Sequence, residues 1–345
     1  MRLVRYRLTD TSVISVSALR SHLPTLSFAA CSTLLLGACA TGGSGSNELV
    51  PTPRYAAHQH LISPAFGKII DQPELDGAAL LRLLDIAGIP RGVVLSMGYS
   101  FGDERKQAKV SNPDSATSAE NDWTSQQVMR SEGRLVGFCS VNPLREAALA
   151  EISRCLALPG IVGLKLHFGN SGVSLRDAAS ARRLEQVFAL ANARRAAIVV
   201  HMRARTGTPY GLEDAQLFLD RLLPRAPDVV VQVAHLAGTA GFPEYAEQAM
   251  SVFASAIERR DPRVRNLYFD QTAVASTETT PEEGERIARM IRRVGTKRVF
   301  FGSDLPISGN LPPAESWAVF RAKVPLKAAE FRAIALNEPR YARRR

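Results

Sequence analysis

The chain has 345 residues, of which 46% are apolar and 22% are charged, an ordinary globular composition that allows a core of good size. Its length fits one large α/β domain or two smaller ones. The formal net charge is +10, but the basic residues are scattered through stretches such as ARRLEQ and RIARMIRR, which is typical of solvated helix faces. Because no basic stripe is interleaved with aromatic residues, we expect no nucleic-acid partner.

The N-terminal 38 residues have the pattern of a targeting segment. Four arginines precede an apolar run of 13 residues, LSFAACSTLLLGA, which is too short to cross a bilayer as a helix. The run ends at Gly37 and Ala38, directly before Cys39. This resembles a bacterial lipoprotein signal. The resemblance implies lipidation of Cys39, a membrane-anchored protein on the periplasmic or outer-membrane side of the cell envelope, and a flexible tether over residues 39–53. The alternatives are a plain secretory signal and a disordered N-terminus.

From residue 54 onward, eight apolar runs rich in Val, Ile and Leu alternate with amphipathic helical stretches. Such runs are typical of parallel strands that are buried on both faces. They are YAAHQHL, GVVLSM, LVGFCSV, IVGLKLH, AAIVVHM, VVVQVAHL, NLYFDQT and RVFFGSD. Eight alternations favour a closed (β/α)8 TIM barrel over an open, doubly wound sheet, so residues 54–345 are predicted to form a single catalytic domain.

Helix signals support this alternation. Asp177 is expected to cap a helix over residues 177–195, and Gly88 to end one over residues 75–88. Residues 98–121 are polar and are predicted to form an irregular insertion above the barrel mouth. Two cysteines of the barrel, Cys139 and Cys155, fall in a predicted strand and a predicted helix. A disulfide is one possibility, and buried free thiols are the state we expect.

All histidines except His22 fall where a predicted strand ends. Active sites of such barrels lie at the C-terminal ends of the strands. His58 and His60 end the first strand and share a face, because alternate residues of a strand point to the same side. His201 ends the fifth strand and Asp304 the eighth. Three imidazoles and one carboxylate suit one divalent ion, Zn²⁺ or alternatively Mn²⁺, with a position left for water.

The remaining polar residues at strand ends receive other roles. His235 and Asp304 are assigned to catalysis, with His235 as the base or orienting group for the water at the metal. Lys165 and His167 end the fourth strand and are assigned to substrate binding. Asp270 ends the seventh strand, and both a turn position and a supporting role behind the ligands remain open for it.

These motifs together resemble the amidohydrolase superfamily, within it the amidohydrolase 2 group related to aminocarboxymuconate semialdehyde decarboxylase. The resemblance covers residues 55–342 and rests on AAHQH, LVGFCSVNP, GIVGLKLH, VVHM, VAHLAG, FFGSDLP and ALNEPRYA. It implies one Zn²⁺-like ion on His58, His60, His201 and Asp304, with His235 acting on the bound water. Two departures are Ala56, where the group often has Asp, and the stretch LNEP, where Gly-Asn-Ala is usual. A second ion on a carbamylated Lys165 is an alternative within the superfamily.

We expect a metal-dependent hydrolase acting on a small carboxylate, lactone or amide. Arg203 and Arg205 follow the fifth strand and are predicted to face this substrate, which favours an anionic one. A non-oxidative decarboxylase of the same family is the alternative. A TatD-like nuclease is disfavoured because the fourth strand, GLKLH, contains no Glu. A non-catalytic, surface-anchored binding lipoprotein is the third possibility, and a homodimer is possible.

Overall fold

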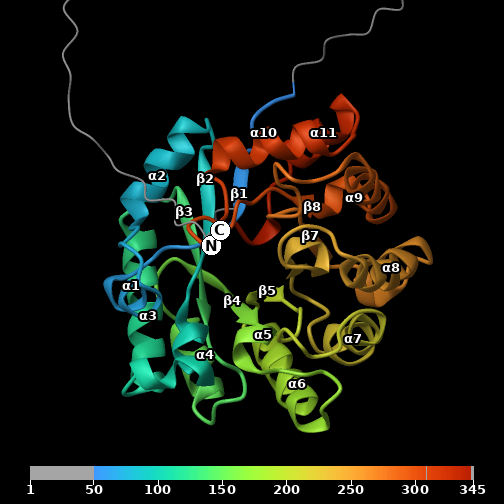
Figure 1. The fold of residues 1–345 in the computed structure, drawn as a ribbon. Helices are drawn as coiled ribbons and strands as arrows, with labels where there is room; N and C mark the ends of the chain where they lie inside the picture. Colours follow the sequence, from blue (N-terminus) through green and yellow to red (C-terminus); the bar gives the residue numbers. More distant parts are fainter. Residues whose placement is uncertain (1–49, 308, 343–345) are drawn as a thin grey trace, which may run out of the picture. The chain divides into compact units, whose positions relative to one another are not determined.

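The computed structural model describes residues 50–307 and 309–342, so the predicted signal and Cys39 lie outside the described residues. Eight parallel strands follow one another around a ring in chain order, and helices surround them (Figure 1). The predicted (β/α)8 barrel is therefore confirmed. The strands are β1 Tyr55–Gln59, β2 Arg91–Leu95, β3 Leu135–Ser140, β4 Ile161–His167, β5 Ala197–His201, β6 Val231–Val233, β7 Leu267–Asp270 and β8 Val299–Phe300.

The ring closes where the first strand meets the segment that follows the last one. Ala57 N–H donates to the Phe301 carbonyl at 2.6 Å, and Asp304 N–H donates to the His58 carbonyl at 3.0 Å. Immediately after β1, the His60 N–H donates to the Leu305 carbonyl at 2.8 Å. Backbone hydrogen bonds at this seam therefore fix the position of Asp304 relative to the two histidines that precede and follow Gln59.

The helices lie outside the strands, and none among the described residues is both long and apolar enough to cross a bilayer. Their boundaries are α1 Pro64–Ile70, α2 Gly77–Ile86, α3 Pro113–Met129, α4 Ala148–Cys155, α5 Phe168–Ser171, α6 Ala178–Ala193, α7 Leu212–Leu217, α8 Glu244–Glu258, α9 Pro281–Val294, α10 Pro313–Lys323 and α11 Ala328–Ala335. Asp177 caps α6 by accepting from the Ser180 N–H at 2.7 Å, and Gly88 follows α2 with a φ of 66°, both as predicted.

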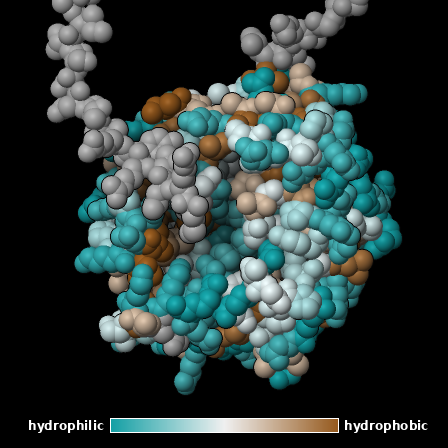
Figure 2. All heavy atoms as spheres, in the orientation of Figure 1, coloured by the Kyte–Doolittle hydropathy of each residue, from teal (hydrophilic) through white to brown (hydrophobic). Residues whose placement is uncertain are grey.

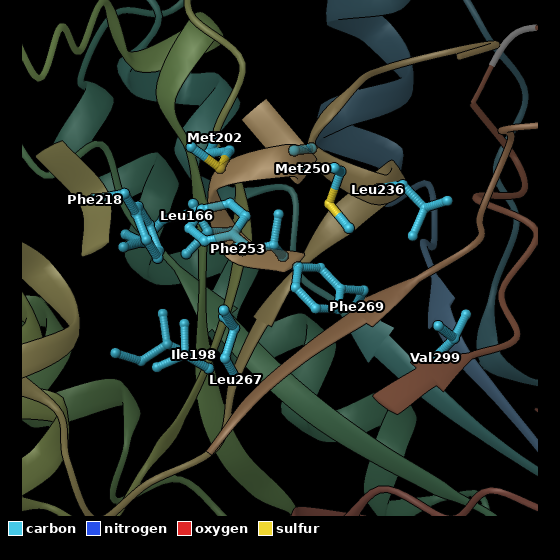
Figure 3. Close-up of a cluster of buried hydrophobic side chains, with 14 of the residues drawn as sticks. Leu166, Ile198, Met202, Phe218, Leu236, Met250, Phe253, Leu267, Phe269 and Val299 are labelled. Atoms are coloured by element: carbon cyan, nitrogen blue, oxygen red, sulfur yellow. The ribbon is translucent and has the colours of Figure 1, made fainter. Parts of the chain in front are cut away.

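Most of the core lies between the strands and the surrounding helices. In Figure 3, Ile198, Leu267 and Phe269 project from strands toward Phe218 and Phe253 of the helical layer. A second, smaller cluster that includes Val93, Phe138 and Val199 fills the inside of the barrel. Because strand residues alternate between the two layers, both faces of each strand are apolar, as the continuous apolar runs of the sequence indicate.

The prediction of an irregular insertion over residues 98–121 is wrong for its second half. Two short 3-10 helices, η1 Gly98–Gly102 and η2 Glu104–Lys109, occupy the first half, whereas α3 begins at Pro113 with Asn112 as its cap. The inward face of α3 is polar, so no apolar stripe marks it in the sequence. Asn121 shows why this face can be buried: its side-chain amide binds the Ser140 carbonyl at 3.0 Å and accepts from the Ser140 N–H at 2.9 Å.

The expectation of free thiols is also wrong, since Cys139 of β3 and Cys155 at the end of α4 form a disulfide. Both cysteines are fully buried. Their spacing in the sequence, 16 residues, gives no sign that the strand and the helix meet at this point. Cross-links of this loop length typically stabilise the folded state by about 3 kcal/mol.

Replacing Glu120 is expected to reveal a pH-dependent cost. Glu120 of α3 is 3% exposed, its Oε2 accepts from Ser63 Oγ at 2.5 Å, and burial raises its pKa from 4.5 to about 7. The folded state therefore binds the proton more tightly than the unfolded state, and stability is lost as pH rises from about 4.5 to 7. The free energy of unfolding of Glu120→Gln, compared with that of the unchanged protein, should increase by about 3 kcal/mol from pH 5 to pH 8. Urea unfolding at the two pH values measures this difference.

The matched control is Glu315→Gln, which removes an exposed carboxylate from α10. The control should change the unfolding free energy by the same small amount at both pH values. If Glu120→Gln behaves in the same way, its carboxyl group does not carry the burial cost.

Candidate active site

A cavity of about 510 Å³ lies at the C-terminal ends of the strands, where the sequence predicted an active site. Figure 2 shows a recess near the centre of the viewed face with mainly hydrophilic walls. Seven of the predicted site residues line the cavity: His58, His60, Lys165, His167, His201, His235 and Asp304. Apolar side chains, including Phe66, Met97, Tyr99 and Ile307, form another part of the wall.

His58, His60 and Asp304 converge on one point. Asp304 Oδ1 lies 3.1 Å from His58 Nε2 and 3.2 Å from His60 Nε2. The other oxygen of this carboxylate accepts from Asn310 Nδ2 at 2.8 Å, which leaves Oδ1 to the two imidazoles. Tetrahedral coordination with bonds of about 2.0–2.1 Å requires ligand atoms about 3.3 Å apart. These two distances, together with ligand atoms that all lie within 4.8 Å of one another, suit one divalent ion.

Hydrogen bonds behind the two imidazoles determine which nitrogen faces this point. His60 Nδ1 lies 2.7 Å from the Leu95 carbonyl, which can only accept, so Nδ1 carries the proton. His58 Nδ1 similarly donates to Asp270 Oδ2 at 3.1 Å. In a neutral ring this leaves the Nε2 lone pair of each histidine directed at Asp304 Oδ1, another acceptor. A cation is the kind of group that satisfies three converging acceptors.

Asp270 lies behind the candidate ligand His58, which favours the supporting role over a turn position. Beyond His58, this fully buried carboxylate accepts from Gln232 Nε2 at 2.7 Å and from the backbone N–H groups of His235 at 2.9 Å and Thr272 at 3.3 Å. Its oxygens are thus occupied by hydrogen bonds. Asp270 therefore orients the His58 side chain and the backbone of His235.

The electrostatic field at this point favours a positive charge. Burial raises the pKa of the Asp304 carboxyl, but the adjacent His58 and His60 outweigh this effect and hold that pKa well below its usual range. Burial and Lys165 lower the pKa of His58, whereas Asp270 and Asp304 raise it, with a net increase. Burial lowers the pKa of His60 to about 4, against the opposing effect of Asp304. Two carboxylates thus surround His58.

His201 lies in the same cavity but beside the point of convergence. Its ring stacks on His167 with 3.9 Å between centroids, and it meets the ring of His235 edge-on at 5.0 Å. Among the described residues, the groups whose ligand atoms lie within 4.8 Å of one another include His58, His60 and Asp304, but not His201. The structure therefore brings three of the four predicted ligands together and leaves the fourth next to them.

His235 occupies a strained segment after β6. Residues His235, Leu236 and Ala237 have φ values of 55°, 44° and 62°, a conformation that costs energy for side chains other than Gly and is often retained at functional sites. His235 Nδ1 donates to the Thr272 carbonyl at 2.9 Å, so Nε2 is the nitrogen left for the cavity. Burial lowers the pKa of His235, which favours the neutral ring.

Lys165 is 1% exposed, and its Nζ lies 3.5 Å from His58 Nε2. Burial lowers its pKa to about 8, although Asp304 and Asp270 raise it. The structure thus places the inward-facing ammonium group next to the point of convergence, where the two carboxylates offset part of the cost of its burial.

The two arginines predicted to face the substrate do not line the cavity. Arg203 packs over the Tyr245 ring, 4.7 Å from its centroid, and donates to the Ala204 carbonyl at 2.6 Å. Arg205 donates to the Gly169 carbonyl at 3.3 Å and lies 3.8 Å from the buried Asp103. Both guanidinium groups find partners within the loops that follow β2, β4 and β5, so they turn away from the cavity.

One cation that lines the cavity, Lys106 of η2, is not among the residues predicted from the sequence. Its Nζ lies 5.4 Å from the centre of the Phe66 ring. Asp103, which forms salt bridges with Arg105 and Arg205, anchors the beginning of this 3-10 helix to the neighbouring loops. Within a polar insertion that looked irregular, no sequence signal distinguished Lys106 from Lys109.

Asp270→Asn should weaken metal binding without removing a ligand. The amide cannot accept all the hydrogen bonds that the carboxylate accepts, so His58 loses its fixed orientation. Such changes behind a ligand typically cost about 10–100-fold in metal affinity. The dissociation constant for Zn²⁺ can be measured by chelator competition, with Asp214→Asn as a control at a buried helix-cap aspartate. An unchanged affinity would assign Asp270 to folding alone.

Several solved structures share this fold. The 2,6-dihydroxybenzoate decarboxylase from Rhizobium has 14% identity and a TM-score of 0.55, with 83% of this chain and 97% of that chain covered. The manganese-bound 5-carboxyvanillate decarboxylase from Novosphingobium aromaticivorans has 13% identity and a TM-score of 0.53, with 83% and 94% covered. A protein described as a probable 2-pyrone-4,6-dicarboxylic acid hydrolase from Acinetobacter baumannii has 16% identity and a TM-score of 0.53, with 81% and 95% covered.

These likenesses establish the fold, and no curated protein matches the sequence. A family model provides the assignment: the model described as Amidohydrolase matches residues 56–340, which include all the residues that line the cavity. The match agrees with the resemblance to the amidohydrolase 2 group that the strand-end motifs carry. The chain therefore belongs to the amidohydrolase family.

Proposed function

We propose that the protein is a metal-dependent hydrolase that acts on a small anionic carboxylate, lactone or amide. The observation that carries the proposal is the convergence of His58, His60 and Asp304 inside a cavity that also holds Lys165 and His235. These three residues would hold one divalent ion, Zn²⁺ or Mn²⁺, with His201 as the fourth ligand. When bound, such an ion polarises a substrate carbonyl and brings the pKa of a water molecule toward neutrality.

The residues around this point have distinct roles. His235 presents Nε2 to the cavity, and the Thr272 carbonyl holds its other nitrogen as a donor, so Nε2 accepts and returns a proton. Lys165 offers an ammonium group to a negatively charged substrate atom close to His58. His167, which stacks on His201 and lies 5.0 Å from the Tyr99 ring between centroids, forms a planar wall.

The substrate is proposed to be a small carboxylate with a flat or apolar body. Phe66, Met97, Tyr99 and Ile307 provide the apolar wall, and Lys106 lies at its edge. The names of the structural neighbours support this proposal, because they describe enzymes of hydroxybenzoate, carboxyvanillate and pyrone dicarboxylic acid chemistry.

Non-oxidative decarboxylation is the second candidate, since two of these neighbours are decarboxylases. The same residues would serve it, with His235 or Lys165 delivering a proton to the carbon that loses the carboxylate. A screen of lactones, amides and aromatic carboxylates separates the two reactions, because only the second releases CO₂. A non-catalytic binding protein would bind metal and ligand but turn over none of these compounds.

His235→Ala and Asp304→Ala should both lose turnover, but only Asp304→Ala should also lose the metal. His235→Ala removes a proton acceptor, so it should keep about one divalent ion per chain and lose about 10²–10⁴-fold in turnover. Asp304→Ala removes a converging ligand, so metal content and turnover should fall together. Metal analysis and rates on any substrate from the screen provide the comparison. Equal loss of metal in both variants would make His235 a ligand.

Lys106→Met should weaken substrate binding rather than chemistry. Loss of one charge-assisted hydrogen bond should raise KM for an anionic substrate about 10–100-fold, with kcat nearly unchanged. Lys109→Met is the matched control, since Lys109 lies on the same 3-10 helix, donates to the Ile69 carbonyl at 2.8 Å and does not line the cavity. Equal kinetics for the two variants would contradict a role for Lys106 in substrate binding.

A further inference from the structure

The positive charge of the barrel is concentrated at the end opposite the candidate active site. Because the eight strands are parallel, the segments that lead into them lie at one end, which we call the base. These segments are residues 50–54, 87–90, 130–134, 156–160, 194–196, 226–230, 259–266, 295–298 and, after α11, 336–342. Together with Arg91, which begins β2, they contain 13 basic and 4 acidic residues, whereas the rest of residues 50–342 contains 23 basic and 27 acidic ones. The base is therefore cationic and the remainder slightly anionic.

Several of these charges have no counterion. Within the described part of the chain, Arg194, Arg195 and Arg340 are exposed and form no salt bridge. Together with Arg91 they line a cavity of about 540 Å³ at the base, and none of the residues that line it is acidic. The floor of this cavity is apolar, formed by side chains that include Val128, Leu135 and Ile161.

Helix ends explain only part of this pattern. Arg130, Arg194 and Arg259 stand at helix C-caps, where a cation interacts favourably with the helix dipole. Arg195 follows its cap with a φ of 54°, and Arg340 begins the 3-10 helix η8, Arg340–Ala342, beyond α11. These two charges are not required by any helix end that the structure describes.

The chain also enters the barrel from the base. Thr52 Oγ1 donates to the Gly88 carbonyl at 3.2 Å, just before β2, and Arg54 N–H donates to the Ala335 carbonyl at 2.8 Å. The 49 residues that precede this point include the apolar run of residues 26–38. A membrane-associated N-terminus would thus be connected to the cationic end of the barrel.

We propose that the base docks on an anionic lipid surface, with the cavity formed by Arg91, Arg194, Arg195 and Arg340 receiving a phosphate headgroup. A rim of guanidinium groups around an apolar floor matches an amphiphile that carries an anionic head. Each basic side chain near an anionic lipid surface contributes to binding without requiring a specific partner group. Because the candidate active site opens at the other end, docking leaves its mouth directed away from the membrane and accessible to a dissolved substrate.

Co-flotation of the full chain with vesicles tests this proposal. One set of vesicles is pure phosphatidylcholine, and the other contains about one-third phosphatidylglycerol at about 0.1 M salt. The base variant combines Arg194→Gln, Arg195→Asn and Arg340→Gln, since Asn tolerates the left-handed backbone at position 195. The control variant combines Arg182→Gln, Arg289→Gln and Arg321→Gln, which removes the same charge from exposed positions of α6, α9 and α10.

The preference is the ratio of binding to phosphatidylglycerol vesicles over binding to pure phosphatidylcholine vesicles. It should fall about 100-fold in the base variant and less than about 3-fold in the control. Equal losses in both variants would reduce the effect to net charge and overturn the proposal. Displacement by inorganic phosphate at matched ionic strength, or equal retention by DNA, would assign the base to a soluble anion instead. If circular dichroism shows that the triple variant is misfolded, single substitutions at 194 and 340 should each reduce the preference about 5-fold.

Discussion

The seam between β1 and the segment after β8 is the constraint on which both the fold and the candidate site depend. The same few residues close the barrel through their backbones and converge through their side chains. Asp304 N–H binds the His58 carbonyl, and Asp304 Oδ1 lies 3.1 Å from the imidazole of that residue. A shift of one residue in this pairing would therefore separate the carboxylate from both histidines. The same backbone pairing therefore determines both the closure of the barrel and the geometry of the candidate site.

Behind this seam, buried hydrogen bonds impose the chemistry of each ring. The Leu95 carbonyl, the Asp270 carboxylate and the Thr272 carbonyl each take the Nδ1 proton of a different histidine, so all three rings have Nε2 left for the cavity. Asp270 connects two of these rings, because it accepts from the side chain of His58 and from the backbone of His235. The interior is thus organised around fixed acceptors whose common complement is a cation.

The two ends of the barrel carry opposite charges: carboxylates at the mouth and guanidinium groups at the base. At the mouth, the carboxylates of the partly buried Asp304 and the buried Asp270 favour a positive charge beside the imidazoles. At the base, exposed guanidinium groups without counterions surround an apolar floor. One end therefore favours a small cation and the other a negatively charged surface, and the core between them separates these two sites.

The sequence by itself determined the barrel and most of the polar residues that line the candidate active site. Eight apolar runs that alternate with capped helices define the strands, and polar residues at the C-terminal ends of such runs are expected near the barrel mouth. For this reason the sequence alone places seven residues of the cavity together: His58, His60, Lys165, His167, His201, His235 and Asp304. Hydrophobic periodicity and polar residues at strand ends are local signals that can be read from a single sequence.

Only the tertiary structure decided the features that depend on distances between elements. The disulfide joins a strand to a helix 16 residues later, and α3 buries a polar face because Asn121 finds backbone partners on β3. Arg203 and Arg205 turn away from the cavity because Tyr245 and Asp103 lie within their reach, while Lys106 enters it from a loop. Each outcome depends on which partner lies within a few ångströms of a long side chain, and one-dimensional spacing does not contain that information.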